Sequence, residues 1–166
     1  MHKPKPWQRF TALAIITGLV AADQLVKLWA QANLRFEAAR ALVPGVLGLQ
    51  YAENTGISFS MLGDSQAAMR VVTILTGLLM LAGLVLLLWG KFGGMQLWSA
   101  ALILAGGLGN LIDRLRQGFV VDYFEFLFVR FAIFNLADVF ITCGVIWLAV
   151  IVLWGERWRS KAAVLP

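Results

Sequence analysis

Four long apolar runs, separated by shorter polar segments, dominate the chain. They lie at residues 10–29, 71–89, 97–112 and 131–154. The hydrocarbon core of a bilayer is about 30 Å thick, and a helix needs roughly 20 apolar residues to cross it. Because each run is close to that length, the pattern predicts four transmembrane helices within a single membrane domain. An even number of spans places both termini on the same side of the membrane.

The two longer connections between these runs, residues 31–69 and 113–130, have other patterns. In the first, LGLQYAEN and ISFSML alternate apolar and polar positions around an NTG turn, which is typical of short strands. The second is too charged to stay in lipid but aromatic enough to lie at its surface, so we expect a loop or short helix there. The predicted fold class is an all-α membrane protein with four transmembrane helices and a small extramembrane β-sheet.

The first apolar run has an alternative interpretation. The basic segment HKPKPWQR, the apolar stretch and VAA before Asp23 resemble a cleavable secretory signal peptide. The apolar pattern nevertheless continues past this position through Leu25, Val26 and Trp29. We therefore expect the first span to be retained.

Composition supports a membrane protein and narrows the possible chemistry. The 166 residues are 60% hydrophobic and 14% charged, with a mean hydropathy of +0.79. The only histidine is His2 and the only cysteine is Cys143, so we expect no intrachain disulfide, no zinc site and no imidazole catalysis. No metal or cofactor is predicted. Cys143 is expected to be a small buried apolar side chain.

The net charge of +5 does not indicate nucleic-acid binding. The basic residues are spread over both termini and the short loops, without an interleaved aromatic platform. Membrane lipids are therefore the expected anionic partners. On the side of the termini, basic residues stand in short segments with few acids, which favours cytoplasmic termini. These residues are Lys3, Lys5, Arg9, Lys91, Arg157, Arg159 and Lys161.

Polar side chains occur at similar depth near the outer ends of three of the four runs. A charged side chain at the bilayer centre costs about 2.5–3.5 kcal/mol, so such residues usually face a bundle interior and indicate function. The segments NLID and NLAD each place an Asn and an Asp three residues apart, on one helix face. Hydrogen bonding between packed helices is the alternative role for the two asparagines. The residues concerned are Asp23, Lys27, Asn110, Asp113, Asn135 and Asp138.

Local pairing accounts for some of these charges and leaves two acids over. Asp23 and Lys27 are one helical turn apart, which suggests an ion pair. Asp113 is followed by Arg114, which suggests an ion pair or an interfacial anchor. Asp122 and Asp138 have no cationic neighbour in sequence. Two carboxylates in a partly dry site can share one proton. Such a pair can activate water and protonate a substrate carbonyl, which hydrolyses an amide without serine, cysteine or metal.

Two functions from other classes compete with a peptidase. A small transporter or channel subunit would use intramembrane acids as a proton relay, and would place them along a through-path that includes the inner half of the membrane. A non-catalytic membrane scaffold would use the same residues for packing alone. It would tolerate Asp to Asn changes with no loss except stability.

Five sequence blocks, in order over nearly the whole chain, resemble one known family. DQLVK, ENTGISFS, GGLGNLIDR, VVDYF and FNLAD are similar to the blocks of the lipoprotein signal peptidases, also called signal peptidase II, of the bacterial inner membrane. The resemblance implies that Asp122 and Asp138 form the catalytic pair of an aspartic endopeptidase. It also implies a set of residues that bind substrate or support the pair: Asp23, Lys27, Asn54, Gly56, Asn110, Asp113, Arg114 and Asn135.

The same resemblance implies a substrate and a location. The substrate is a prolipoprotein whose signal peptide is removed just before a cysteine that carries an S-diacylglyceryl group. The site is expected on the periplasmic side, beneath the small sheet and a mobile loop or short helix, in a monomer that needs no cofactor. Two positions depart from the family pattern, because Val26 stands where Ser or Thr is common and Ser58 stands where Ala is frequent.

Overall fold

The structure is a computed structural model that describes residues 4–55 and 66–162. Within these residues, the three strands form one antiparallel sheet in the order β1-β2-β3, and all four helices are long and apolar enough to cross a membrane. The predicted class of four long apolar helices with a small sheet is confirmed. In chain order the elements are α1 (Pro6–Leu34), β1 (Arg40–Val43), β2 (Leu47–Asn54), α2 (Gln66–Leu88), α3 (Met95–Gln117), β3 (Val120–Phe126) and α4 (Leu136–Ala162).

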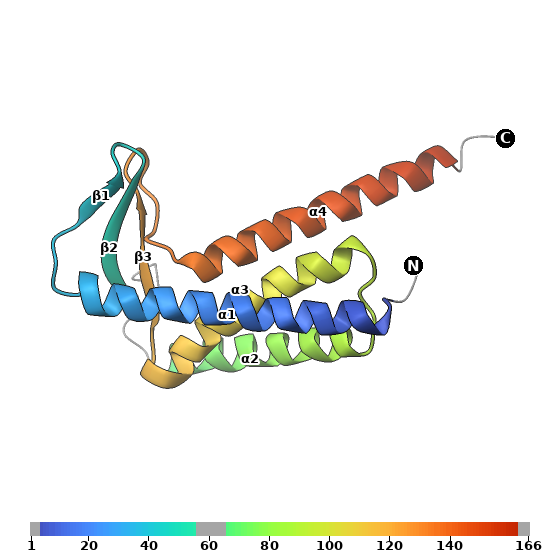
Figure 1. Cartoon of the computed structure of the whole chain (residues 1–166), viewed down its shortest axis with the longest axis horizontal. Coiled ribbons are helices and arrows are strands. Elements are labelled where there is room, and N and C mark those ends of the chain that lie inside the picture. The colour runs from blue at the N-terminus through green and yellow to red at the C-terminus, as the bar shows by residue number, and fades with distance from the viewer. Residues whose placement is uncertain (1–3, 56–65, 163–166) are drawn as a thin grey trace.

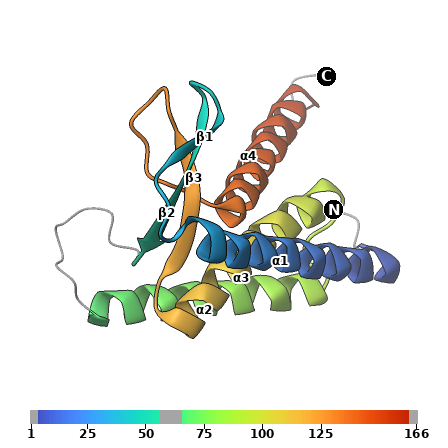
Figure 2. The same cartoon turned by 60° about the vertical axis from the view of Figure 1, so that its left-hand side comes forward.

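The sheet lies at one end of the helices, and the start of α1 and the end of α4 lie at the other (Figure 1). Helix α3 is central, because it packs against α1, α2 and α4. Of its apolar segment 56% is buried, against 22% or less for the other three helices, whose apolar faces point outward as lipid-facing helices require. Strand β3 rises from the end of α3 past the end of α1 (Figure 2).

Helices α3 and α4 approach each other closely because glycines stand at their contact. A Cβ atom at Gly106 would overlap the backbone oxygen of Ala137, and one at Gly144 would lie 2.9 Å from the backbone oxygen of Ser99. Small residues allow such approach between membrane helices. The first turn of α4, which contains Asp138, is thereby held against α3.

All four helices have boundaries that differ from the predicted spans, and α2 begins at Gln66 rather than at 71. Helix α1 runs from Pro6 to Leu34 rather than over 10–29. Helix α3 continues beyond 112 to Gln117, because Asp113 is paired inside the bundle and its charge does not end the helix. It stops at Gly118, whose φ of 81° is left-handed and whose N–H bonds the last turn. Helix α4 begins at Leu136 rather than at 131.

The segment predicted as a loop or short helix, residues 113–130, contains the last turn of α3 and strand β3, and is a loop only at residues 118–119 and 127–130. In β3, Asp122 lies opposite Ala52 and Val120 opposite Asn54 of β2. The sequence VVDYFEF does not alternate apolar and polar residues, because no residue of β3 is exposed. Its pattern therefore does not predict a strand. The predicted strand LGLQYAEN is β2, whereas ISFSML lies outside the described residues.

Candidate active site

Asp122 lies in the middle of β3 and is only 2% exposed. Its Oδ1 accepts a hydrogen bond from Asn135 Nδ2 at 2.6 Å, and its Oδ2 accepts one from Asn54 Nδ2 at 2.8 Å. Burial raises the pKa of Asp122 to about 6, and the charge of Asp138 acts in the same direction, while the two amides oppose it. This carboxyl group can therefore hold or release a proton near neutral pH.

Asp138 lies in the first turn of α4, where it closes a capping box with Asn135. The backbone N–H of Asp138 donates to Asn135 Oδ1 at 3.0 Å, and the backbone N–H of Asn135 donates to Asp138 Oδ2 at 3.1 Å. This reciprocal arrangement satisfies two N–H groups that the start of a helix otherwise leaves unpaired. It also fixes the carboxylate, whose Oδ1 accepts from Asn110 Nδ2 at 2.8 Å.

The two similar segments NLID and NLAD therefore have different structural roles. NLID lies inside α3, where Asn110 and Asp113 point toward α1 and the base of the sheet. NLAD spans the start of α4, where Asn135 is the N-cap and Asp138 is the third helical residue. The prediction that each Asn and Asp share one helix face holds only for the first, because Asn135 precedes its helix.

Asn135 and Asn110 join the two aspartates. The Asn135 side chain donates from Nδ2 to both Asp122 Oδ1 and Asn110 Oδ1, and its backbone N–H donates to Asp138. Asn110 Oδ1 also accepts from Lys27 Nζ at 2.7 Å. Both amides are buried, with exposed fractions of 0% and 6%. One continuous hydrogen-bonded chain thus runs from Lys27 to both carboxylates.

Lys27 is buried between two carboxylates, one from α1 and one from α3. Its Nζ lies 3.0 Å from Asp23 Oδ2 and 3.0 Å from Asp113 Oδ2. The expected pair of Asp23 with Lys27 is present. The expected pair of Asp113 with Arg114 was wrong, because Asp113 faces α1 and reaches Lys27 instead.

Arg114 is half-buried near the aspartates. Its charge interacts with those of Asp138, Asp122 and Asp113, while its Nη1 makes a long bond of 3.4 Å to Asn110 O. Its Nε is buried and has no hydrogen-bond partner within residues 4–55 and 66–162. The guanidinium therefore supplies positive charge to the site, and its Nε–H can donate a further hydrogen bond.

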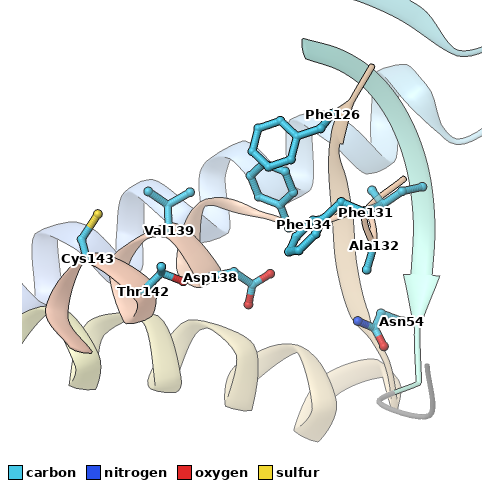
Figure 3. Close-up of a pocket in the computed structure, with 10 residues that line it drawn as sticks. Asn54, Phe126, Phe131, Ala132, Phe134, Asp138, Val139, Thr142 and Cys143 are labelled. Atoms are coloured by element: carbon cyan, nitrogen blue, oxygen red, sulfur yellow. The ribbon is translucent and has the colours of Figure 1, made fainter. Parts of the chain in front are cut away.

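A cavity of about 400 Å³ opens beside Asp138 (Figure 3). Asp138 points into it from α4, and Asn54 lies across from it on β2. Most of the lining is apolar and aromatic, which suits an apolar ligand that meets a few polar groups. Cys143 lies on this wall and is exposed, so the prediction that it is buried was wrong. The other lining residues are Phe126, Phe131, Ala132, Ile133, Phe134, Val139 and Thr142.

The structure brings together all of the predicted site residues that it describes, and Gly56 lies outside the described residues. Sequence reasoning missed two contributors. Gln24 contacts both Asp23 and Asp113 from the position next to Asp23. Tyr123 is fully buried and its hydroxyl accepts from the backbone N–H of Leu136 at 3.2 Å. Each stands next to a predicted acid, within the blocks DQLVK and VVDYF respectively.

Comparisons with known proteins identify a family. The family model described as Signal peptidase (SPase) II matches residues 15–154. Lipoprotein signal peptidases of Streptococcus pyogenes serotype M5 (strain Manfredo) and serotype M18 (strain MGAS8232) are 39% identical over 153 residues, which cover 90% of this chain and 96% of each relative.

Two solved structures have a similar fold. Both are described as a bacterial membrane enzyme solved by the in meso method, one at 2.3 Å and one at 1.9 Å resolution. Each superposes with a TM-score of 0.77 at 26% sequence identity. The matched region covers 94% of both chains in the first case, and 92% of this chain and 97% of the other in the second.

Proposed function

The chain belongs to the signal peptidase II family of lipoprotein signal peptidases, and we propose that Asp122 and Asp138 are its catalytic pair. As a member of that family it is an aspartic peptidase that removes signal peptides from prolipoproteins, and a multi-pass bacterial membrane protein. The observation that carries the assignment is the shared role of Asn135, which donates from its side chain to Asp122 and from its backbone to Asp138.

The pair acts with one proton between two carboxyl groups. The ionised group removes a proton from a water molecule, whose oxygen attacks the scissile carbonyl carbon. The protonated group donates its proton to the carbonyl oxygen, and the tetrahedral intermediate then collapses as a proton passes to the leaving amine. Arg114 adds positive charge beside the developing negative charge. Asn54, Asn110 and Asn135 hold the two carboxylates without adding charge.

The cavity next to Asp138 supports the substrate class that the family implies. Its apolar wall extends from the aromatic residues after β3 to Thr142 and Cys143 on the outward face of α4. A peptide tethered to the bilayer by acyl chains can approach along this wall and present its scissile bond to the pair. We assign cleavage to the bond before the S-diacylglyceryl cysteine of the prolipoprotein.

The single membrane domain is assigned to the inner membrane, with cytoplasmic termini, a periplasmic site and lipid around a monomer. The sheet, which contains Asp122, and the start of α4, which contains Asp138, lie at the end of the helices opposite the described ends of the chain (Figure 1). Basic side chains near the other end, including Arg9 and Lys91, favour the cytoplasm there. This orientation places the reacting carboxyl groups where the anchored substrate emerges from the membrane.

The substrate assignment is tested with the purified enzyme and two forms of one prolipoprotein. One form carries the diacylglyceryl group on its cysteine, and the other has that cysteine replaced by serine. Mass spectrometry is expected to show a product that begins with the lipid-modified cysteine, and no cleavage of the serine form. Equal cleavage of both forms, or cleavage at another bond, contradicts the assignment.

Replacing Asn54 with Ala is expected to shift the pH dependence of kcat/KM. In the native enzyme kcat/KM is expected to fall as pH rises beyond about 6, because Asp122 then loses the shared proton. The Asn54 amide stabilises the ionised carboxylate, so its removal raises the pKa of Asp122 and moves this alkaline limb to higher pH. Asn33→Ala is the control, because among the residues that the structure describes that amide bonds only to Trp29 O, within α1. An unmoved or acid-shifted limb in Asn54→Ala contradicts this role.

Alkylation of Cys143 is expected to inhibit cleavage. The thiol is exposed on the cavity wall, one turn beyond Asp138 and next to Thr142, so a bulky maleimide there occupies the path of the substrate. Inhibition is expected to be slowed by bound substrate and to be absent in Cys143→Ser, which should itself remain active. Full activity of a stoichiometrically alkylated enzyme would show that the substrate enters elsewhere.

A further inference from the structure

We infer that a cluster of three buried residues, Asp23, Lys27 and Asp113, with the half-buried Gln24, sets the spacing of the two catalytic aspartates, and that Gln24 is a positioning residue that joins the two carboxylates of the cluster. The inference rests on the proposed catalytic pair. It assigns to Gln24 a role in the reaction that neither its position in the sequence nor its chemistry alone suggests. The cluster lies between α1 and α3, away from the cavity wall.

Each carboxylate of the cluster binds the main chain immediately before one catalytic aspartate. Asp23 Oδ1 accepts from the backbone N–H of Ala137 at 3.0 Å, and Ala137 precedes Asp138. Asp113 Oδ2 accepts from the backbone N–H of Val121 at 3.1 Å, and Val121 precedes Asp122. The start of α4 and the start of β3 are thus fixed by two side chains that are themselves held together.

Two residues hold these carboxylates at a fixed separation. Lys27 lies 3.0 Å from an oxygen of each and neutralises their repulsion. Gln24 Nε2 donates to Asp113 Oδ1 at 3.0 Å and lies 3.3 Å from Asp23 Oδ2. All four carboxylate oxygens therefore have a donor. A rotation of either group would withdraw its oxygen from Ala137 or Val121.

The surroundings of Gln24 leave little freedom for the cluster. Its Nε2 also lies 3.1 Å from Gly109 O, which ties it to α3. A Cβ atom at Gly109 would come within 2.5 Å of Asp23 Oδ2. The contact between α1 and α3 at this point therefore has room for the Asp23 carboxylate but not for a side chain at position 109. A small cavity of about 20 Å³ lies beside Gln24, Lys27 and Asp113, enough for about one water molecule. Loss of the amide would let water compete for Asp113.

The test compares Gln24→Met with Gln31→Met in the purified enzyme. Gln31 is a matched control, because its Nε2 also links α1 to α3, through Gln117 Oε1 at 2.8 Å, but binds neither carboxylate. For Gln24→Met, kcat for a diacylglyceryl prolipoprotein peptide is expected to fall about 10-fold to 100-fold, with KM unchanged within about twofold, because small misplacements of reacting groups have effects of this size. Gln31→Met is expected to keep the native kcat.

The pH profile of kcat/KM separates a positioning role of Gln24 from a general loss of stability. If the aspartates move apart, each feels less of the other's charge, so the alkaline limb of kcat/KM in Gln24→Met should move to lower pH. Gln24→His, which keeps a ring N–H donor at similar reach, is expected to retain more activity than Gln24→Met. It also provides the measurement if the Met variant does not fold. Native kcat and pH profile in Gln24→Met, equal losses in Gln31→Met, or equal losses in Gln24→His would each overturn the inference.

The catalytic assignment is measured alongside with Asp122→Asn and Asp138→Asn. If both are inactive while Gln24→Met behaves as the native enzyme, only the positioning role fails. If either aspartate variant cleaves normally, the proposed function of the pair fails whatever the result at Gln24.

Discussion

Asp138→Asn is expected to lower kcat by about 10²–10⁴-fold, the usual contribution of general acid–base catalysis, while the protein stays folded. The amide keeps the shape of the carboxylate, and its oxygen can still accept from Asn110 or from the backbone of Asn135. What it loses is the ability to exchange a proton. Cleavage of a diacylglyceryl prolipoprotein by the purified variant is the measurement, with thermal unfolding as the check on folding.

Asp122→Asn is expected to lose activity to the same extent and to keep its stability at alkaline pH. Because the pKa of Asp122 is raised to about 6 in the folded state, its stabilising effect is complete below the ordinary pKa of 3.8 and is lost as pH rises through 6. At pH 8 the proton on Asp122 therefore makes no contribution to the stability of the native protein. Glu125→Gln, the same chemical change on the same strand, is the control and should remain active. Normal cleavage by either folded aspartate variant would contradict the assignment.

Lys27→Met is expected to have the largest effect on stability. Lys27 is 2% exposed, and its loss leaves Asp23 and Asp113 facing each other in a buried site. Breaking a buried pair by removing one partner costs about 3–5 kcal/mol. The free energy of unfolding in detergent should fall by that amount, and activity should fall with it because both backbone anchors are loosened.

A triple variant shows whether uncompensated charge is the cause. In Lys27→Met combined with Asp23→Asn and Asp113→Asn, no ionised group of the cluster remains, so stability should recover in large part. Activity should recover less, because amides bind the backbone N–H groups more weakly than carboxylates do. A Lys27→Met variant as stable as the native protein would mean that the ion pairs do not support the fold.

The membrane spans and one strand could be predicted because their signals are local. Hydropathy over a run of about 20 residues identifies a span wherever it packs, and the alternation in LGLQYAEN identifies β2 by itself. The convergence of polar residues followed from their common depth near the outer ends of the runs. The depth of a residue in the membrane depends on its number of residues from the end of the run, and this number can be read from the sequence.

The remaining features depend on contacts between distant segments. Strand β3 exists because VVDYFEF pairs with β2, which is far away in sequence. The partner of Asp113 depends on how α3 is rotated against α1, so adjacency to Arg114 was misleading. Adjacency to Asp23 did not reveal the role of Gln24, because an amide next to an acid acquires that role only when α1 meets α3.

One local signal was available and was assigned to the wrong role. An Asn followed three residues later by an acid, just before an apolar run, is the pattern of a capping box. In NLAD this pattern marks the start of α4 and explains why Asp138 lies at the end of the helix rather than inside it. The same motif thus orients the carboxylate of Asp138, which we propose to be catalytic.

The most direct test of the account is single-turnover cleavage by Asp122→Asn, Asp138→Asn and the double variant. Groups that act as one unit show strongly non-additive losses. If the two aspartates share one proton, the double variant should be within about threefold of the single variants, because either change already disables the unit. Losses that multiply, or a single variant with native cleavage, would show that Asp122 and Asp138 do not act as a pair.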